Sequence, residues 1–301
     1  MTWNIRTGGR DSGGADRRDL LARVVVAERP DVLALQELRD FDSGAVLADF
    51  AGRVGMRPHL ARSCFGQPVA VLLRPPLRAL AATRVRRPFH HAAQRVTVAT
   101  TAGPLTVLSV HLDPYSGLRR RIEAGWAAAA LRRAPGELGL LAGDLNTLDP
   151  VAEHTDRIAR LPPAYRRRHL RRDGRTVETR AVARLLAAGL VDLYAAANHP
   201  IGGPGGAGVL VADPSDGAVR YRLSGGAAAG PADDGLTAPT RHGGGAEFSG
   251  MRLDYLFGTA ALANRVRDCR VRRGGESEYA SDHYPVVVDL DLDPAPPSGP
   301  A

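Results

Sequence analysis

The sequence predicts an α/β protein whose mixed strands pack as two sheets with helices outside. Three observations carry this prediction. Short apolar runs alternate with helical patterns over the first two thirds of the chain. An apolar hairpin and a helix-poor last third indicate antiparallel pairing as well. With 301 residues, 44% of them hydrophobic, the chain can bury a sizeable core.

Apolar periodicity and turn residues give the elements of the first half. Pro75-Pro76 ends one apolar run, and Ala102-Gly103-Pro104 separates two others, as expected of a hairpin turn. In chain order we expect a helix at 16–28, strands at 31–36 and 69–73, hairpin strands at 94–100 and 105–112, a helix at 116–132 and a strand at 138–143.

The second half reads as a helix at 177–188, a strand at 190–194 and closing strands at 252–257, 266–272 and 285–291. Residues 201–247 are rich in Gly, Ala, Pro and Asp with little periodicity, so we expect a long flexible insertion. The tail at 293–301 is expected to be disordered. We expect residues 1–292 to form a single domain, because the polar motifs described below come from both ends of the chain.

The charge of the chain suits an anionic partner. All 40 basic residues are arginine, and the formal net charge is +8. Such a balance favours nucleic acid or lipid headgroups as partners. Basic residues that are all arginine, together with many Ala and Gly residues, are equally typical of a GC-rich coding bias. Both interpretations of the charge therefore stay open here.

Cysteine usage and hydropathy limit the class of protein. Cys64 and Cys269 lie far apart and outside any disulfide or zinc pattern. They suit free thiols in a reducing compartment, so we expect a cytoplasmic protein. We also expect a monomer. No run approaches the ~20 apolar residues of a membrane helix, and we find no signal peptide before the first motif.

Polar residues follow or interrupt apolar runs in six places. The motifs are Thr2-Trp3-Asn4-Ile5, Leu35-Gln36-Glu37, Ser109-Val110-His111-Leu112, Gly143-Asp144-Leu145-Asn146, Arg252-Leu253-Asp254-Tyr255 and Ser281-Asp282-His283-Tyr284-Pro285. Together they supply carboxylates, two asparagines and two histidines. Such a set can hold a hard divalent cation, orient a water and bind a phosphate.

Two of these motifs end buried strands. Glu37 would reach a cleft there and suit Mg²⁺, although a helix cap or a surface position explains it as simply. Asp144 and Asn146 stand two residues apart, so an extended path would place both side chains on one face. The pair could then orient a water and a phosphoryl oxygen. An Asx-type turn explains the same residues equally well.

Asp282 and His283 are neighbours whose side chains would point to opposite sides of an extended segment. The acid could face a metal while the histidine faces a phosphate. Asp254 could hold that imidazole in one tautomer. In isolation, the Asp-His pair fits a solvated loop, His111 a core or surface histidine, and Asn4 a buried turn residue.

Taken in order, the motifs resemble those of the endonuclease/exonuclease/phosphatase superfamily. It includes DNase I, apurinic endonucleases, neutral sphingomyelinases, inositol-polyphosphate phosphatases and tyrosyl-DNA phosphodiesterases. The resemblance spans residues 2–288, and Leu-Gln-Glu, Gly-Asp-Leu-Asn and Ser-Asp-His are specific as a set. It implies a four-layer α/β sandwich, in which two mixed sheets lie face to face between helices and the site lies at one edge.

The resemblance implies a metal site. Glu37 is expected to be the principal ligand of Mg²⁺ or Mn²⁺, aided by Asp282 and Asn4. Some nucleases of the superfamily carry an acid where this chain has Arg6, which leaves one or two metals open. The first strand also lacks the residues that usually precede Thr-Trp-Asn. Either the natural start lies upstream, where a signal peptide could be encoded, or this strand is short.

The resemblance also implies catalytic roles. Asp144 and Asn146 are expected to position or deprotonate the water and to bind the phosphate. His283, supported by Asp254, is expected to contact the phosphate or act as acid and base. His111, which matches a second histidine found in some members, is expected to take part in catalysis and in substrate binding. The other expected substrate-binding residues are Asn146 and Arg95, and many members keep an arginine at the place of Arg95.

We therefore expect a Mg²⁺-dependent phosphoesterase that cleaves a phosphodiester or phosphomonoester by water attack. Cations offset the negative charge that develops on the phosphate in such a reaction. Nucleic acid is the favoured substrate because of the net charge and of Arg166, Arg167, Arg168, Arg171 and Arg172. Lipid headgroups and small phosphorylated metabolites stay open, and a non-catalytic binding module on the same fold is the second hypothesis.

Overall fold

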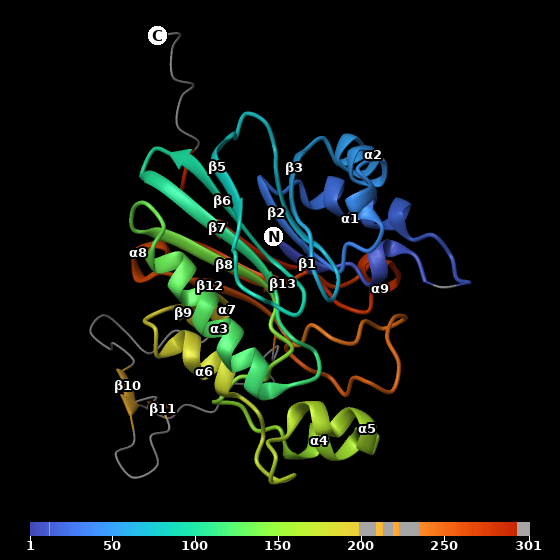
Figure 1. Ribbon diagram of the computed structural model, residues 1–301, viewed down its shortest axis with the longest axis vertical. Helices are drawn as coiled ribbons and strands as arrows, with labels where there is room; N and C mark the ends of the chain where they lie inside the picture. The colour runs from blue at the N-terminus through green and yellow to red at the C-terminus, as the bar shows by residue number, and fades with distance from the viewer. Residues whose placement is uncertain (12, 199–208, 213–218, 223–234, 294–301) are drawn as a thin grey trace.

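Two six-stranded sheets lie face to face at the centre of the protein (Figure 1). The computed structural model describes residues 1–11, 13–198, 209–212, 219–222 and 235–293. The first sheet has the order β13, β14, β1, β2, β4, β3, with bounds Val266–Val271, Val286–Leu290, Thr2–Asn4, Val32–Gln36, Val69–Leu73 and Arg57–Ala61. The second has the order β5, β6, β7, β8, β12, β9, with bounds Ala79–Arg84, Ala93–Thr100, Gly103–His111, Leu138–Asp144, Asp254–Gly258 and Val191–Asp192.

Both sheets are mixed. β1 runs parallel to β2, and β7 runs parallel to β8. The other strand pairs among the described residues are antiparallel. Each parallel pair is joined by a helical crossover, as parallel strands require. The expected mixed α/β architecture is confirmed.

Strand β4 shows how the layers are held together. All five of its side chains are buried, and the last four alternate between two apolar clusters. Ala70 and Leu72 face the helices outside the first sheet, whereas Val71 and Leu73 face the second sheet. This two-residue alternation is the natural period of a strand. It places an apolar layer on each face of the sheet.

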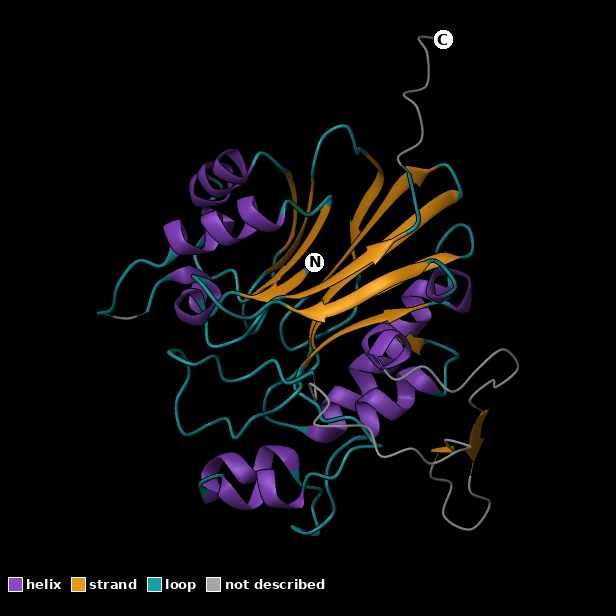
Figure 2. Ribbon diagram, turned by 180° about the vertical axis from the view of Figure 1, so that it is seen from behind, coloured by secondary structure: helices purple, strands orange, loops and turns teal. Residues whose placement is uncertain are grey.

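Helices cover the outer face of each sheet, which gives the four layers (Figure 2). α1 (Arg18–Glu28) and α2 (Ala45–Val54) pack on the first sheet through residues such as Leu21 and Phe50. α3 (Gly117–Arg132) and α6 (Arg180–Leu186) pack on the second. Further short helices are α4 (Thr155–Arg160), α5 (Pro163–Arg166), α7 (Leu193–Asn198), α8 (Ala260–Ala263) and α9 (Ser277–Ala280), with 3₁₀ turns at Thr7–Gly9, Phe41–Ser43 and Arg167–His169.

Long, strongly periodic elements match their prediction closely. β4 has the predicted bounds, and the hairpin β6–β7 and helix α3 differ from them by one or two residues. The strand expected at 190–194 is shorter, because α7 begins at Leu193. β3 and β5 had no predicted counterpart. Both are edge strands with largely exposed or half-buried side chains, so they carry no apolar period.

The expected insertion at 201–247 falls partly outside the described residues. Within it, β10 (Val209–Ala212) and β11 (Val219–Arg222) form an antiparallel hairpin. Residues 235–247 pack beside the polar motifs: Thr237 accepts hydrogen bonds from the backbone of Leu253 and Asp254. The tail expected to be disordered lies outside the described residues from 294 onward.

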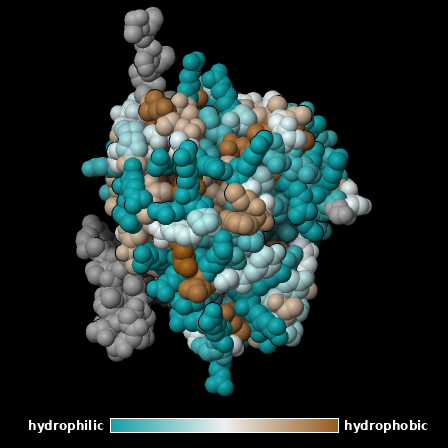
Figure 3. All heavy atoms as spheres, in the orientation of Figure 1, coloured by the Kyte–Doolittle hydropathy of each residue, from teal (hydrophilic) through white to brown (hydrophobic). Residues whose placement is uncertain are grey.

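The face of the protein seen in Figure 3 is mostly hydrophilic, with apolar side chains in small separate areas. Among the described residues, no helix has the length and apolar character needed to cross a membrane.

The polar motifs meet at one edge of the two sheets. In the first sheet, Asn4 lies beside Gln36, so β1 and β2 end together. In the second sheet Asp144 pairs with His111 on one side and with Asp254 on the other. Strand pairing therefore gathers residues from both halves of the chain at this edge.

A glycine makes this convergence possible. The backbone of Gly143 has φ +149°, and a Cβ built on it would lie 1.9 Å from the carbonyl oxygen of Val110 in β7. Any side chain there would push β8 away from β7 next to Asp144. The Gly-Asp order of the motif thus has a steric cause.

We expect Gly143→Ala to lower the free energy of unfolding by about 2–4 kcal/mol, through overpacking and an unfavourable backbone conformation. Chemical denaturation measures this. Gly52→Ala is the matched control, because Gly52 lies in helix α2 with open space around it. That control should leave stability unchanged or raise it by up to ~1 kcal/mol. Equal effects of the two substitutions would contradict the steric explanation.

Candidate active site

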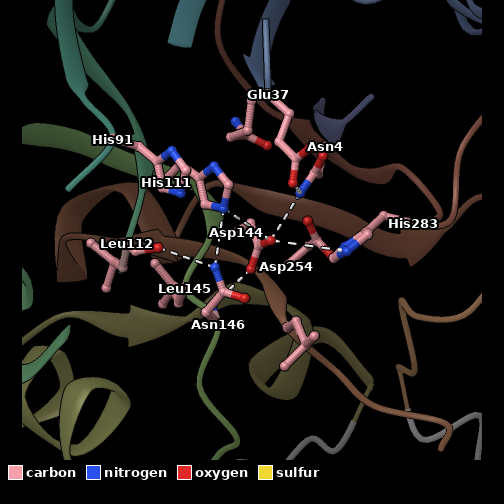
Figure 4. Close-up of polar contacts among 12 residues, drawn as sticks. Asn4, Glu37, His91, His111, Leu112, Asp144, Leu145, Asn146, Asp254 and His283 are labelled. Atoms are coloured by element: carbon pink, nitrogen blue, oxygen red, sulfur yellow. Dashed lines mark hydrogen bonds and ion pairs between the residues drawn. The ribbon is translucent and has the colours of Figure 1, made fainter. Parts of the chain in front are cut away.

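Asp144 is the centre of a buried polar cluster in which both sheets take part (Figure 4). It ends β8, and its carboxylate is almost fully buried. Its Oδ2 accepts a hydrogen bond from Nδ2 of Asn4, at 3.0 Å, across the sheet interface. Nε2 of His111 and Nε2 of His283 lie 3.5 and 4.0 Å from the same oxygen. The predicted site residues from both ends of the chain are thus brought together.

The carboxylate of Glu37 is held by three donors. Glu37 follows β2 with φ +60°, which turns its side chain toward the cluster. Its Oε2 accepts from the backbone N–H of Thr7 at 2.9 Å and from Nε2 of Gln67 at 3.0 Å. Its Oε1 accepts from Nδ2 of Asn4 at 3.1 Å. This half-buried group is fixed in place but still reaches solvent.

Asn4 joins the two carboxylates. Its amide nitrogen donates to both Glu37 and Asp144, while its Oδ1 accepts from the backbone N–H of Arg6 at 3.0 Å. In this arrangement the nitrogen, not the oxygen, faces the carboxylates. Asn4 therefore positions the acids here, and its role as a metal ligand stays a prediction.

Asp144 and Asn146 meet through a turn and not through an extended path. Asn146 has φ +49°, and its backbone N–H donates to Oδ1 of Asp144 at 2.7 Å. This is the Asx geometry that the sequence also allowed. Nδ2 of Asn146 donates to the carbonyl of Leu112 at 3.1 Å and lies 3.0 Å from Nε2 of His111. The turn thus aims the asparagine at the cluster.

His283 and Asp254 form a buried hydrogen-bonded pair. Nδ1 of His283 lies 2.7 Å from Oδ2 of Asp254, and both side chains are nearly inaccessible. The other oxygen of Asp254 has no partner among the described residues. The indole Nε1 of Trp3 donates to the backbone carbonyl of His283 at 2.7 Å. The imidazole therefore presents Nε2 toward Asp144 in one orientation.

The buried side chain of Asp282 lies beside Arg6. Its Oδ2 is 3.6 Å from Nε of Arg6, and Oδ1 accepts from Oγ of Ser281 at 3.3 Å. Arg6 also faces Asp11 at 3.4 Å. Arg6 thus places a positive charge next to Asp282, at the position where the resemblance also allowed an acid.

Burial and neighbouring charges set the titration of the cluster. Burial, reinforced by the nearby charge of Asp254, raises the pKa of Asp144 to about 7. Burial also raises the pKa of Asp282. For His283, burial favours the neutral form, but the carboxylate of Asp254 outweighs it and raises the pKa well above the usual value. Burial lowers the pKa of His111, and nearby histidines add to the effect.

Sequence reasoning missed three contributors. The ring of His91 stacks on His111 with centroids 3.8 Å apart and planes 2° from parallel. Its Nδ1 accepts from the backbone N–H of Gln67 at 2.8 Å, and Gln67 in turn holds Glu37. Arg17 donates to the backbone carbonyls of Ile5, Arg6 and Ala280, and so ties the first motif to the segment before Asp282. The His90-His91 doublet before a strand was the available signal.

Arg95 is not brought into this cluster. It lies in β6, and its Nη2 donates to Oγ1 of Thr83 on β5 at 3.3 Å. Among the described residues, no hydrogen bond or ion pair connects its side chain to the site. Its expected role in substrate binding stays a prediction that this geometry does not support.

The donor set suits a hard divalent cation. Carboxylate oxygens are the preferred ligands of Mg²⁺ and Mn²⁺, and the half-buried Glu37 and the buried Asp282 supply them. Ligand atoms of Asp144, Asp254 and His283 also lie within 4.8 Å of one another. In that second group, the short hydrogen bond to Asp254 already uses Nδ1 of His283, and the raised pKa of this imidazole disfavours the neutral form that binds a metal. The first pair is therefore the better candidate for the metal.

Comparison with known proteins agrees with this geometry. Residues 1–283 match the endonuclease/exonuclease/phosphatase family. The chain belongs to this family. A search of curated proteins found no match.

Solved structures share the fold of this family member at low identity. An AP endonuclease from Archaeoglobus fulgidus has a TM-score of 0.63 at 17% identity, covering 96% of this chain and 98% of that one. An endonuclease/exonuclease/phosphatase family protein from Leptotrichia buccalis has 0.60 at 18%, covering 96% and 98%. A mannosyl-6-phosphatase from Bacteroides thetaiotaomicron has 0.59 at 14%, covering 96% and 97%. At these identities the likeness shows the four-layer fold alone.

The two histidines beside Asp144 should carry different charges. In the metal-free protein at about pH 7.5 we expect His283 to be protonated and His111 neutral, because their pKa values shift in opposite directions. Nitrogen-15 NMR of the imidazoles measures this. Asp254→Asn should lower the pKa of His283 and leave His111 neutral. A neutral His283 at about pH 7.5 would contradict the assignment.

The His283–Asp254 pair should also make the stability of the fold depend on pH. Because folding raises the pKa of His283, the pair stabilises the fold fully below the unfolded value of about 6.5 and loses this contribution as the pH rises through the folded pKa. The stability difference between parent and Asp254→Asn should therefore shrink as the solution becomes more alkaline.

Proposed function

We propose that the protein is a Mg²⁺- or Mn²⁺-dependent phosphoesterase that hydrolyses a phosphodiester or a phosphomonoester. One observation carries the proposal. The Asp144 carboxylate lies between two differently equipped groups: Asn4 links it to Glu37, and His283 faces it from the pair with Asp254. A candidate base thus stands between a candidate cation site and a cationic imidazole.

The metal would be held by Glu37, with Asp282 beside it. When bound, a divalent cation neutralises phosphate charge and polarises the P–O bond. The chain's own contribution is to fix Glu37 through Thr7, Gln67 and Asn4, so that its carboxylate does not have to reorganise during the reaction.

Asp144 and Asn146 would position the water. The raised pKa of Asp144, about 7, suits a carboxylate that accepts a proton near neutral pH. The amide of Asn146, fixed by its turn, would hold a phosphoryl oxygen or the water itself. Direct attack by water requires no covalent nucleophile.

His283 would stabilise the negative charge that develops on the phosphate. Asp254 keeps its imidazole protonated and oriented, with Nε2 directed toward Asp144. A cation positioned in advance in a buried site is worth far more there than in water. The same group can donate a proton to the leaving oxygen.

Similar structures leave the substrate open. One is an AP endonuclease and another a mannosyl-6-phosphatase, so this fold accommodates both nucleic-acid and sugar phosphates. Lipid headgroups and small metabolites are therefore the alternative substrates for the same site.

Metal removal tests the proposal first. Hydrolysis of bis-(p-nitrophenyl) phosphate or p-nitrophenyl phosphate should vanish after treatment with EDTA and return with Mg²⁺ or Mn²⁺. This follows because carboxylates, and no cysteine cluster among the described residues, form the donor set. Full turnover after exhaustive chelation would refute the metal assignment.

Substitutions then separate the roles. Asp144→Asn and His283→Ala should each lower turnover at least ~10²-fold, the scale of losing a positioned base or a charge-stabilising group. Glu37→Gln should mainly raise the Mg²⁺ concentration required for half-maximal activity. The control is Asp156→Asn, an exposed carboxylate in helix α4, which should keep parental turnover. Parental turnover of a folded His283→Ala protein would overturn the assigned role.

A further inference from the structure

A groove of about 330 Å³ opens beside the catalytic cluster. It lies between the segment that follows β3 and the segment that joins β5 to β6. The residues that matter for its chemistry are Arg62, Cys64, Arg84, Arg86, Arg87 and His91. Ala, Val, Pro and Phe side chains complete its walls, and no acidic residue lines it within the described chain.

The four arginines of this groove are not neutralised by the protein. All four are exposed, and none forms an ion pair with a described residue. Arg62 donates one hydrogen bond, to the backbone carbonyl of Asp42 at 2.9 Å. Elsewhere on the surface arginines do pair, as Arg270 does with Asp268 and Asp289. Four unpaired cations around one hollow create a positive potential that attracts an anion.

The groove adjoins the catalytic cluster through the stacked rings of His91 and His111. His91 lines the groove, and the face of its ring stacks on His111, 3.8 Å away. His111 in turn lies 3.5 Å from Asp144. Nε2 of His91 is buried and has no partner among the described residues. A ligand in the groove would therefore be separated from Asp144 by the two stacked imidazole rings of His91 and His111.

The geometry points to a single nucleic-acid strand as the occupant, with its backbone phosphates on the arginines and one phosphate at Asp144. Arg84, Arg86 and Arg87 follow one another along one segment, and Arg62 faces them from the other wall. That spread suits successive phosphates of a chain more than one compact phosphate group. Phe65, 68% exposed in the segment after β3, offers a surface on which a base can stack. This inference rests on the proposed function, because it extends the same site.

The arginines at 166–172 are less suited to this task. Nη2 of Arg166 donates to the carbonyls of Ala159 and Leu161, so it caps a helix of its own segment. The guanidinium of Arg168 lies over the rings of Tyr115 and Tyr165 and faces Glu247 at 3.6 Å. Two of the five predicted contacts are thus engaged within the protein.

Binding of a short fluorescein-labelled oligothymidylate, followed by anisotropy in EDTA over a range of NaCl concentrations, tests the inference. The groove variant combines Arg84→Ser, Arg86→Ser and Arg87→Ser. It should bind at least ~10-fold more weakly than the parent. Its log–log salt slope should be smaller by about 2, because three contacts to a single strand each contribute about 0.7.

The control variant combines Arg167→Ser, Arg171→Ser and Arg172→Ser, which removes the same three charges from exposed positions. It should bind within about 3-fold of the parent. Equal weakening in both variants would show that only net charge matters, and no weakening in the groove variant would show that the strand binds elsewhere. Either result overturns the inference.

Cys64 provides a second measurement on the unaltered protein, in case the groove variant does not fold. Cys64 is exposed in the groove, whereas Cys269 is buried, with its pKa raised to about 12 by burial. Neutral iodoacetamide should therefore label Cys64 alone. Saturating oligothymidylate should slow this labelling at least ~10-fold. Unchanged labelling, or protection by anionic phosphatidylserine vesicles but not by the oligonucleotide, would overturn the inference.

Failure of this inference can be told apart from failure of the proposed function. Binding and protection are measured without metal and need no turnover. Hydrolysis of bis-(p-nitrophenyl) phosphate by the parent reports on the catalytic cluster alone. A protein that cleaves the small ester but leaves Cys64 unprotected keeps its function and loses the nucleic-acid assignment.

Discussion

The buried carboxylate of Asp144 is the constraint on which the rest of this structure depends. A carboxylate removed from water is costly unless hydrogen bonds and opposite charges compensate for it. Here the compensation comes from both sheets: Asn4 donates from the first, Asn146 donates from the turn after β8, and two histidines lie within 4.0 Å. The group therefore remains in place only while the sheets are packed at this edge. The packing of the two sheets and the geometry of the site consequently depend on each other in this fold.

The backbone around that edge is held in conformations that residues other than glycine seldom adopt. Arg6, Thr7, Glu37 and Asn146 all have positive φ, and each lies in or next to the cluster. Such conformations cost about 1–3 kcal/mol each and persist only when the surroundings enforce them. Backbone donors enforce two of them, since Thr7 binds Glu37 and Asn146 binds Asp144. The strained backbone thus fixes the orientation of the two carboxylates through these hydrogen bonds. Such preorganised groups are what electrostatic stabilisation of a transition state requires.

The sequence predicted the layers and most of the cluster because both depend on strong local signals. Buried strands such as β4 show apolar runs, and each polar motif stands where such a run begins or ends. It could not predict β3 and β5, whose exposed edges carry no period. Nor could it show that Asp144 and Asn146 meet through a left-handed turn, since the extended and turned paths fit the same four residues. His91 was missed for another reason: stacking on a partner 20 residues away leaves no spacing to detect.

The net charge also shows what the sequence alone could not predict. A total of +8 does not say which arginines are free to bind an anionic substrate. All basic residues of this chain are arginines, and many of their guanidinium groups are engaged in contacts within the protein. Arg17 donates to three backbone carbonyls, and Arg252 faces Asp192 in a buried pair. Arg168 covers two tyrosines. Since an arginine paired with a carboxylate adds little to the field outside the protein, the potential that a substrate meets is set mainly by the arginines without such a partner. Four arginines without an ion pair to any described residue surround the groove beside His91, so the position of these charges, and not the total number of arginines, favours a polyanionic substrate there.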